Sequence, residues 1–320
     1  MDLSLGNGRI VLMLSIIVPV FNEEEGLENF YKELIKYIPG IEKNYEVIFV
    51  DDGSLDDTLE ILKKIALKNS LVKIFSLRKH KGKAEALTLG FSQASGDYIL
   101  TIDADLQDKP DQIEKLIKKS KEDWDVVSGW RRDRKDSFIK VLSSRMFNFL
   151  AGLFWGLKVR DLNCGLKLYK KEAAKSLNLY GGMHRFIPLL LHEQGFTIAE
   201  VPVAHGKRRF GKSKYSFTKV FTEMPDIFTM LFLSRYGRRP LHFFAPIGGI
   251  MFFAGIAILF YLTVLKIEGY AIGGRPLLFL GMILVISGLQ VLFTGFLADL
   301  IISKTSKNNN KEFILKYKSK

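Results

Sequence analysis

Two aspartates separated by one residue have a type and spacing suited to chemistry. Asp103 and Asp105 form the turn D-A-D directly after the apolar run from Tyr98 to Ile102. Where a chain leaves an extended strand, two carboxylates in this spacing can both reach a hard cation such as Mg²⁺ or Mn²⁺. Such a cation keeps coordination positions open for diphosphate oxygens. The turn therefore predicts a divalent metal site, with solvated loop carboxylates as the alternative.

Two further polar turns follow apolar runs in the same part of the chain. One reads P-V-F-N-E and ends at Glu23, and the other reads D-D-G-S and begins at Asp51. In open parallel α/β sheets the ligand lies outside the carboxyl ends of the strands, so all three turns should meet at one crevice. Their carboxylates would repel one another and any phosphate, and a divalent cation would relieve this repulsion.

The D-D-G-S turn has two interpretations. Asp51 and Asp52 could hydrogen-bond the base or ribose of a nucleotide. They could instead form only a strand-end turn and a helix cap. Ser54 and Asp57 stand in S-x-x-D spacing, which predicts the N-terminal cap of the next helix.

Short β-branched runs alternate with helical patterns from Ser15 onward, which predicts an α/β fold with a mainly parallel sheet flanked by helices. The predicted strands run from Ser15 to Val20, Tyr45 to Val50, Val72 to Leu77, Tyr98 to Ile102 and Asp125 to Ser128. The predicted helices include Glu24 to Tyr37, Asp56 to Lys68, Lys83 to Ala94 and Asp111 to Ser120.

Several well-known sites are missing from the sequence. No G-x-x-x-x-G-K-[ST] occurs, and no G-x-G-x-x-G follows the first strand, which disfavours P-loop ATPases and Rossmann-type dehydrogenases. The single cysteine, Cys164, excludes a disulfide-stapled scaffold. The five histidines show no metal-ligand spacing. His184 and His205 are weaker site candidates, and the other three, His80, His192 and His242, are interpreted as structural.

Two uncharged runs near the C-terminus, Phe243 to Leu265 and Pro276 to Ala298, are long enough to cross a bilayer. The connecting segment has three glycines, so the runs predict a transmembrane hairpin. Lysines and arginines flank the hairpin far more than they occupy its connection, which places both termini and the preceding domain in the cytoplasm. Gly281, Gly288 and Gly295 share one face, with Gln290 nearby. This face suits packing within the hairpin or between subunits of a homo-oligomer.

Charge is unevenly distributed along the 320 residues, whose net charge is +13. Residues 1–117 hold 14 Lys+Arg against 20 Asp+Glu, whereas residues 118–240 hold 25 against 11. The basic middle lies beside apolar spans, which favours anionic headgroups or phosphates as partners, with nucleic acid as the other standard interpretation. Its basic residues cluster in two places, over Trp130 to Arg134 with Lys140 to Asn148, and over Lys207 to Lys214. These clusters could be solvated faces, lipid contacts or the site of an acceptor phosphate.

Five segments in order carry a resemblance to a known family: V-P-V-F-N-E-E, V-D-D-G-S-L-D-D-T, R-K-H-K-G-K-A-E-A, A-S-G-D-Y-I-L-T-I-D-A-D-L-Q-D and R-R-F-G-K-S-K-Y. Over about residues 13–240 the chain resembles family 2 glycosyltransferases of the GT-A fold, and among them the dolichyl-phosphate mannose synthase-like polyprenyl-phosphate glycosyltransferases. The resemblance implies transfer of a sugar from a nucleotide diphosphate, of the GDP-mannose or UDP-glucose type, to a polyprenyl or dolichyl phosphate, using Mg²⁺ or Mn²⁺.

The resemblance also implies roles for single residues. Those implied to contact the nucleoside are Pro19, Phe21, Glu23 and Asp52. Those matching the metal and diphosphate motif are Asp103, Asp105 and Gln107. Those implied to bind the acceptor phosphate are Arg131, Arg145, Arg209 and Lys214. Asp103, Asp105 and Arg145 are expected to be catalytic.

A phosphate acceptor is already anionic, so no strong general base is needed. The sequence agrees, because no E-D pair follows the D-A-D turn and the Q-x-x-R-W of processive synthases is absent. We therefore expect transfer of one sugar by in-line attack with inversion. The alternatives are a transferase acting on a lipid or saccharide hydroxyl and a non-catalytic membrane protein that binds nucleotide sugars.

The expected organisation has four parts. A GT-A catalytic domain covers residues 1–214, an amphipathic juxtamembrane helix 215–240, the hairpin 241–300, and a basic cytoplasmic tail 301–320. The apolar stripe from Val220 to Leu233 predicts that the juxtamembrane helix lies in the membrane interface, although a core helix has the same pattern. The segment from Phe138 to Leu157 could be a second helix of this kind.

Overall fold

A computed structural model describes residues 13–132, 159–206 and 239–306, together with positions 152, 156, 157, 229, 232, 236 and 237. The chain divides into two compact units, residues 1–226 and 227–320. The predicted juxtamembrane helix over 215–240 and the segment from Phe138 to Leu157 lie almost entirely outside the described residues, as does most of the tail.

The first unit is built on a sheet with the strand order β3-β2-β1-β4-β6-β5-β7. These strands are β1 (Leu14–Val20), β2 (Tyr45–Asp51), β3 (Val72–Ser76), β4 (Tyr98–Thr101), β5 (Val126–Arg131), β6 (Lys167–Lys170) and β7 (Ile198–Val203). All neighbouring pairs are parallel except the two that β6 makes, with β4 and with β5. The prediction of a mainly parallel sheet is confirmed.

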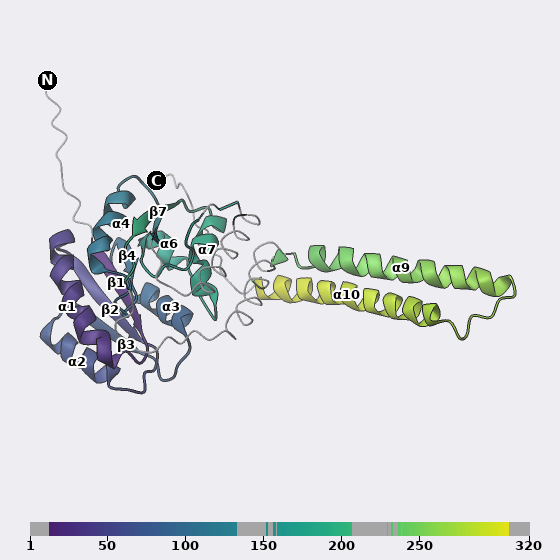
Figure 1. Ribbon diagram of the computed structural model, residues 1–320, viewed down its shortest axis with the longest axis horizontal. Helices are drawn as coiled ribbons and strands as arrows, with labels where there is room; N and C mark the ends of the chain where they lie inside the picture. Colours follow the sequence, from purple (N-terminus) through teal and green to yellow (C-terminus); the bar gives the residue numbers. More distant parts are fainter. Residues whose placement is uncertain are drawn as a thin grey trace, which may run out of the picture. The chain divides into compact units, whose positions relative to one another are not determined.

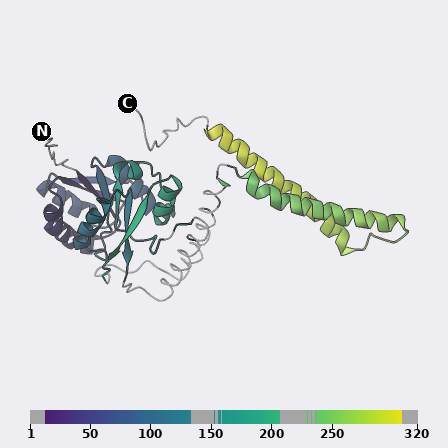
Figure 2. The same ribbon diagram turned by 90° about the horizontal axis from the view of Figure 1, so that it is seen from above.

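Helices cover both faces of this sheet, and Figures 1 and 2 show the layers from two directions. The helices of the first unit are α1 (Glu24–Ile41), α2 (Thr58–Lys68), α3 (Lys83–Gln93), α4 (Ile113–Ser120), α6 (Lys171–Lys175) and α7 (Ile187–Glu193), with 3₁₀ turns η1 (Pro110–Gln112) and η2 (Met183–Phe186). Alternate residues of β1 serve two cores, as a strand's period of two requires. Ile16 packs in the core with α1, α2 and α4, and Ile17 in the core with α3, α6 and α7.

The ends of the predicted elements differ from the structure in a few places. Strand β5 extends three residues past the predicted end at Ser128, and strands β6 and β7 were not predicted from the sequence. The predicted cap at Ser54 is wrong. The hydroxyl oxygen of Ser54 accepts the backbone N–H of Asn22 at 2.9 Å, and the first N–H of α2, at Thr58, is bound by Asp56 at 3.1 Å. Ser54 thus joins the ends of β1 and β2 instead of capping α2.

The second unit contains the two predicted apolar helices, α9 (Leu241–Ile267) and α10 (Pro276–Ser306), which lie side by side in Figure 1. Both are long and apolar enough to cross a membrane, and only 11% of the most apolar stretch of each is buried. A soluble core helix would be mostly covered, so these helices have the surface expected of a membrane hairpin.

Glycines allow the two helices to approach closely. A Cβ on Gly248 would lie 2.8 Å from the carbonyl oxygen of Gly288, and one on Gly255 would lie 2.8 Å from that of Gly281. A Cβ on Gly295 would lie 2.7 Å from the Cβ of Phe244. The glycine face of α10 is therefore used within the hairpin.

We predict that Gly248→Leu destabilises the hairpin, because the added side chain has no room between the helices. Overpacking of this kind costs about 1–3 kcal/mol. Gly249→Leu is the matched control, since a Cβ there meets nothing within 4 Å. Thermal unfolding in detergent, followed by helical circular dichroism, should show a lower melting temperature for the first variant only. Equal melting temperatures would contradict the packing.

Candidate active site

The carboxyl ends of β1 and β2 are joined by hydrogen bonds between their turns. Asn22, which has a left-handed φ of 52°, accepts the N–H of Leu55 on its side-chain oxygen at 2.8 Å. The N–H of Glu23 donates to the hydroxyl of Thr58 at 2.9 Å. These contacts hold two of the three predicted acidic turns together at one edge of the sheet.

The predicted nucleoside residues Phe21 and Asp52 lie beside His80. The carboxylate of Asp52 accepts the N–H groups of Lys81 and Gly82 at 2.8 Å each and lies 2.8 Å from Nδ1 of His80. The His80 ring stacks on Phe21, with centroids 4.0 Å apart and planes 23° apart. Asp52 thus fixes the loop that follows β3, and this loop presents an aromatic surface beside the strand ends.

Gly53 explains why this loop can lie so close to β2. Its φ is +71°, and a Cβ there would lie 2.6 Å from the carbonyl carbon of Lys79. Any other residue would both strain the turn and displace the loop. Pro19, the predicted nucleoside residue that lies within β1, is half-buried.

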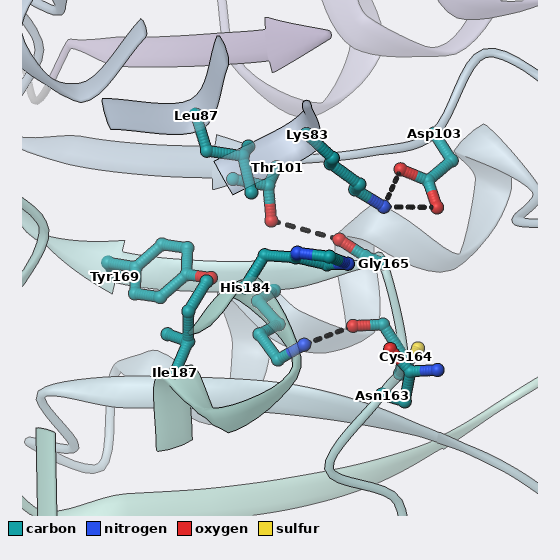
Figure 3. Close-up of a pocket in the computed structure, with 11 residues that line it drawn as sticks. Lys83, Leu87, Thr101, Asp103, Asn163, Cys164, Gly165, Tyr169, His184 and Ile187 are labelled. Carbon is teal, nitrogen blue, oxygen red and sulfur yellow. Dashed lines mark hydrogen bonds and ion pairs between the residues drawn. The ribbon is translucent and has the colours of Figure 1, made fainter. Parts of the chain in front are cut away.

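The third acidic turn forms an ion pair with a lysine from helix α3. The ammonium of Lys83, the first residue of α3, lies 2.5 and 2.7 Å from the two carboxylate oxygens of Asp103 (Figure 3). Burial raises the pKa of Asp103, but the charge and hydrogen bonds of Lys83 outweigh it, so the pKa lies below its ordinary value. The N–H of Gln107 donates to Asp105 at 3.1 Å, so this hydrogen bond joins two of the three predicted metal ligands.

Two histidines that the sequence marked only as weaker candidates lie at this turn. His184, in η2, lines a pocket together with Lys83 and Asp103. His205 forms an isolated β-bridge with Asp108, three residues past Asp105, and Gly206 donates its N–H to the carbonyl of Gln107 at 2.8 Å. Their spacing in the sequence does not predict this position, because the tertiary fold brings both residues to the turn from distant parts of the chain.

Arg131, predicted to bind the acceptor phosphate, forms a buried ion pair in the structure. Its guanidinium donates to the carboxylate of Asp161 at 2.7 and 3.0 Å, and the two side chains are 10% and 2% exposed. Burial alone would lower the pKa of Arg131, but the hydrogen bond and the charge of Asp161 raise it by more. The pKa therefore lies above its ordinary value, and the guanidinium stays charged. The other predicted phosphate residues, Arg145, Arg209 and Lys214, lie outside the described residues.

The oxygen donors at the D-A-D turn fit a hard divalent cation. Asp103 and Asp105 carry carboxylates and Gln107 carries a side-chain amide, which are oxygen donors of the kind that such a cation binds, and the ammonium of Lys83 already balances the charge of Asp103. Within residues 13–132, 159–206 and 239–306, no group of three or more His, Cys, Asp and Glu is arranged to hold a metal. A site of two carboxylates suits an ion that shares its coordination with a phosphorylated ligand.

Comparisons with known proteins identify the family of this chain. Residues 15–177 match the family described as glycosyl transferase family 2. The chain is 36% identical to dodecaprenyl-phosphate galacturonate synthase of Rhizobium johnstonii, over 91% of this chain and 88% of that protein. It is 32% identical to undecaprenyl-phosphate 4-deoxy-4-formamido-L-arabinose transferase of Proteus mirabilis, over 90% and 88%. The chain belongs to glycosyl transferase family 2, and it is a glycosyltransferase.

Solved structures show the same fold. Glucosyl-3-phosphoglycerate synthase from Mycobacterium tuberculosis, in a complex with Mn²⁺, UDP and glucosyl-3-phosphoglycerate, superposes with a TM-score of 0.52 at 19% identity. The match covers 71% of this chain and 79% of that one. The complex of the same enzyme with Mn²⁺ and UDP-glucose gives a TM-score of 0.53 at 18% identity, over 70% and 79%. The first unit therefore has the GT-A fold.

We predict that Arg131→Met lowers the free energy of unfolding by about 3–5 kcal/mol, because it leaves the buried carboxylate of Asp161 without its partner. Arg132→Met is the matched control, since Arg132 is exposed and its loss should change the free energy by less than about 0.5 kcal/mol. Chemical denaturation in detergent measures both. Unchanged stability of Arg131→Met, together with weaker binding of a lipid phosphate, would instead make Arg131 a ligand-binding residue.

Proposed function

We propose that this protein transfers one sugar from a nucleoside diphosphate sugar to a polyprenyl or dolichyl phosphate, with inversion and with a divalent cation, at the cytoplasmic face of a membrane. The observation that carries the proposal is the Lys83–Asp103 pair at the end of β4, in the same sheet as the aromatic surface at the ends of β1 and β2. The names of the two polyprenyl-phosphate relatives support the acceptor.

Asp103, Asp105 and Gln107 would hold Mg²⁺ or Mn²⁺. When bound, the ion supplies a Lewis acid that stabilises the departing nucleoside diphosphate. Lys83 adds a positive charge beside the same carboxylate, so diphosphate oxygens near the turn would meet a cation from α3 as well. The Mn²⁺ and UDP in the M. tuberculosis complexes support this proposal without deciding between the two metals.

The nucleoside would lie against Phe21 and His80, next to Asp52, with Pro19 and Glu23 at the end of β1. This surface is aromatic and does not distinguish guanine from uracil. GDP-mannose and UDP-glucose types of donor both remain in the proposal. The two relatives are named for galacturonate and formamido-arabinose, so we propose no preference for mannose.

The acceptor phosphate requires cations, since it must approach a sugar that already carries a diphosphate. Arg131 is paired with Asp161, so the proposal rests on Arg145, Arg209 and Lys214. The apolar helices α9 and α10 would anchor the enzyme where its lipid substrate lies, with both termini in the cytoplasm. A hydroxyl acceptor and a non-catalytic sugar-nucleotide binder are the competing functions.

The proposal is tested by incubating the purified full-length protein with UDP-glucose, UDP-galacturonate or GDP-mannose, a polyprenyl phosphate, and Mg²⁺ or Mn²⁺. We expect a glycolipid with at least one donor and none after addition of EDTA. Absence of product with every donor would contradict the proposal. Product from a polyprenol but not from its phosphate would favour the hydroxyl alternative.

We predict that Asp105→Ala reduces this transfer at least about 100-fold, because the leaving diphosphate loses its charge stabilisation. The melting temperature should not change, since Asp105 is only half-buried. Asp111→Ala, at an exposed carboxylate in η1, is the matched control and should retain full activity. Retained turnover in Asp105→Ala would refute the metal assignment.

We also propose a second copy of this chain as a partner, through the outer face of α10. Gln290 is the middle residue of the apolar stretch Pro276–Lys304, and its side chain is exposed while the glycine face packs on α9. A primary amide both donates and accepts hydrogen bonds, so two copies of Gln290 can satisfy each other in hydrocarbon.

Gln290→Leu should weaken self-association about tenfold, as expected for loss of a hydrogen bond worth about 1–2 kcal/mol in a membrane. Thr263→Leu is the control, because the exposed Thr263 hydroxyl already donates to the carbonyl of Leu259 at 2.8 Å. Energy transfer between labelled copies, measured in vesicles over a dilution series, gives both affinities. A wild-type monomer, or equal affinities for both variants, would contradict this interface.

A further inference from the structure

A pocket continues from the D-A-D turn toward β6, and Figure 3 shows its lining. Lys83 and Asp103 lie at one side, and the segment Asn163, Cys164 and Gly165 approaches from the other. Between them lies the imidazole of His184. Leu87 and Ile187 add apolar surface, so the pocket has both polar and apolar walls.

The polar groups of this pocket are mostly committed to partners. The hydroxyl of Thr101 donates to the carbonyl of Gly165 at 2.9 Å, and the ammonium of Lys167 donates to the carbonyl of Cys164. By contrast, Nδ1 of His184 is buried and forms no hydrogen bond of ordinary geometry with the described residues, although the backbone of Gly181 also interacts with the imidazole. A buried polar atom of this kind in a native protein calls for an explanation, and a ligand that bonds to it is one.

The order of the strands indicates which part of a donor would reach His184. The nucleoside surface lies at the ends of β2 and β1, the D-A-D turn follows β4, and β6 is the next strand in the sheet. In a nucleoside diphosphate sugar the diphosphate lies between the nucleoside and the sugar. With the nucleoside at β1 and β2 and the diphosphate at β4, the sugar extends toward β6 and the pocket lined by His184.

The charge state of His184 also fits a sugar better than a phosphate. Burial and the neighbouring cations Lys83 and Arg185 lower its pKa to about 3, so the imidazole is neutral at physiological pH. A neutral imidazole has one donor and one acceptor nitrogen, which match the donor and acceptor character of a hydroxyl group.

We propose that His184 is a specificity-determining residue that hydrogen-bonds a hydroxyl group of the donor's sugar through Nδ1. This inference rests on the proposed function, because it takes a nucleoside diphosphate sugar as the ligand. It adds that discrimination between sugars occurs beside β6, separately from recognition of the base at β1 and β2.

The test compares a nucleoside diphosphate with its sugar ester, which share the nucleoside and the diphosphate and differ in the sugar and in one ionisable phosphate oxygen. Calorimetry with Mn²⁺ measures the affinity of the full-length protein for UDP, or GDP, and for the corresponding nucleotide sugars from the donor panel. His184→Leu should weaken binding of the preferred nucleotide sugar about tenfold and leave the free nucleotide unchanged, since a buried hydrogen bond is lost. His184→Asn, whose side-chain amide retains polar atoms, should recover part of the loss.

His192→Leu is the matched control, because His192 lies exposed at the end of α7 and should have no effect on either ligand. Equal weakening of nucleotide and nucleotide sugar in His184→Leu would show a structural role and overturn the inference. Unchanged binding of both ligands would also overturn it.

This binding measurement does not depend on turnover. A selective loss of sugar affinity in a protein that forms no glycolipid would support the inference and reject only the proposed catalysis.

Discussion

The charge on Asp103 is the constraint on which the site depends. For a carboxylate that is partly shielded from water at the end of a central strand, burial raises the pKa and a neighbouring cation lowers it. In the described structure that cation is the ammonium of Lys83, at the start of α3. The turn therefore brings a carboxylate and an ammonium together, so a divalent ion has a physical reason to bind the first and a diphosphate the second.

The order of the strands in the sheet sets the order of the surfaces along its edge. Parallel strands β2, β1 and β4 bring their polar turns to one edge, and the antiparallel β6 closes the site on the far side of β4. Asp52 fixes the loop carrying His80, and Gly53 lets it lie close to the strand ends. A donor laid along this edge would meet an aromatic surface, then charge, then the pocket with His184.

Much of the fold follows from local patterns in the sequence. The runs that form β1 to β4 are short and rich in β-branched residues, which is typical of strands. The uncharged stretches that form α9 and α10 are long enough to span a membrane, which predicts helices. Strand β6 has only four residues, and its pairing with both β4 and β5 depends on distant segments. Such a strand has too little periodicity to be predicted from its own residues.

The site was predictable only in part, for a similar reason. Asp52, Asp103 and Asp105 follow predicted strands, and the topology of parallel sheets places such turns together. Lys83, His184 and His205 reach the turn through α3, η2 and the segment after β7, so no spacing along the chain reveals them. The charge of Arg131 was evident in the sequence, but its buried partner Asp161, thirty residues away, was not.

The most direct test of the central claim is a structure of the full-length protein crystallised with Mn²⁺ and a nucleoside diphosphate, using the anomalous signal of manganese. The account predicts one manganese peak in contact with the carboxylates of Asp103 and Asp105 and with the diphosphate. A bound nucleotide with those two carboxylates turned away from it, or manganese at another place, would contradict the account.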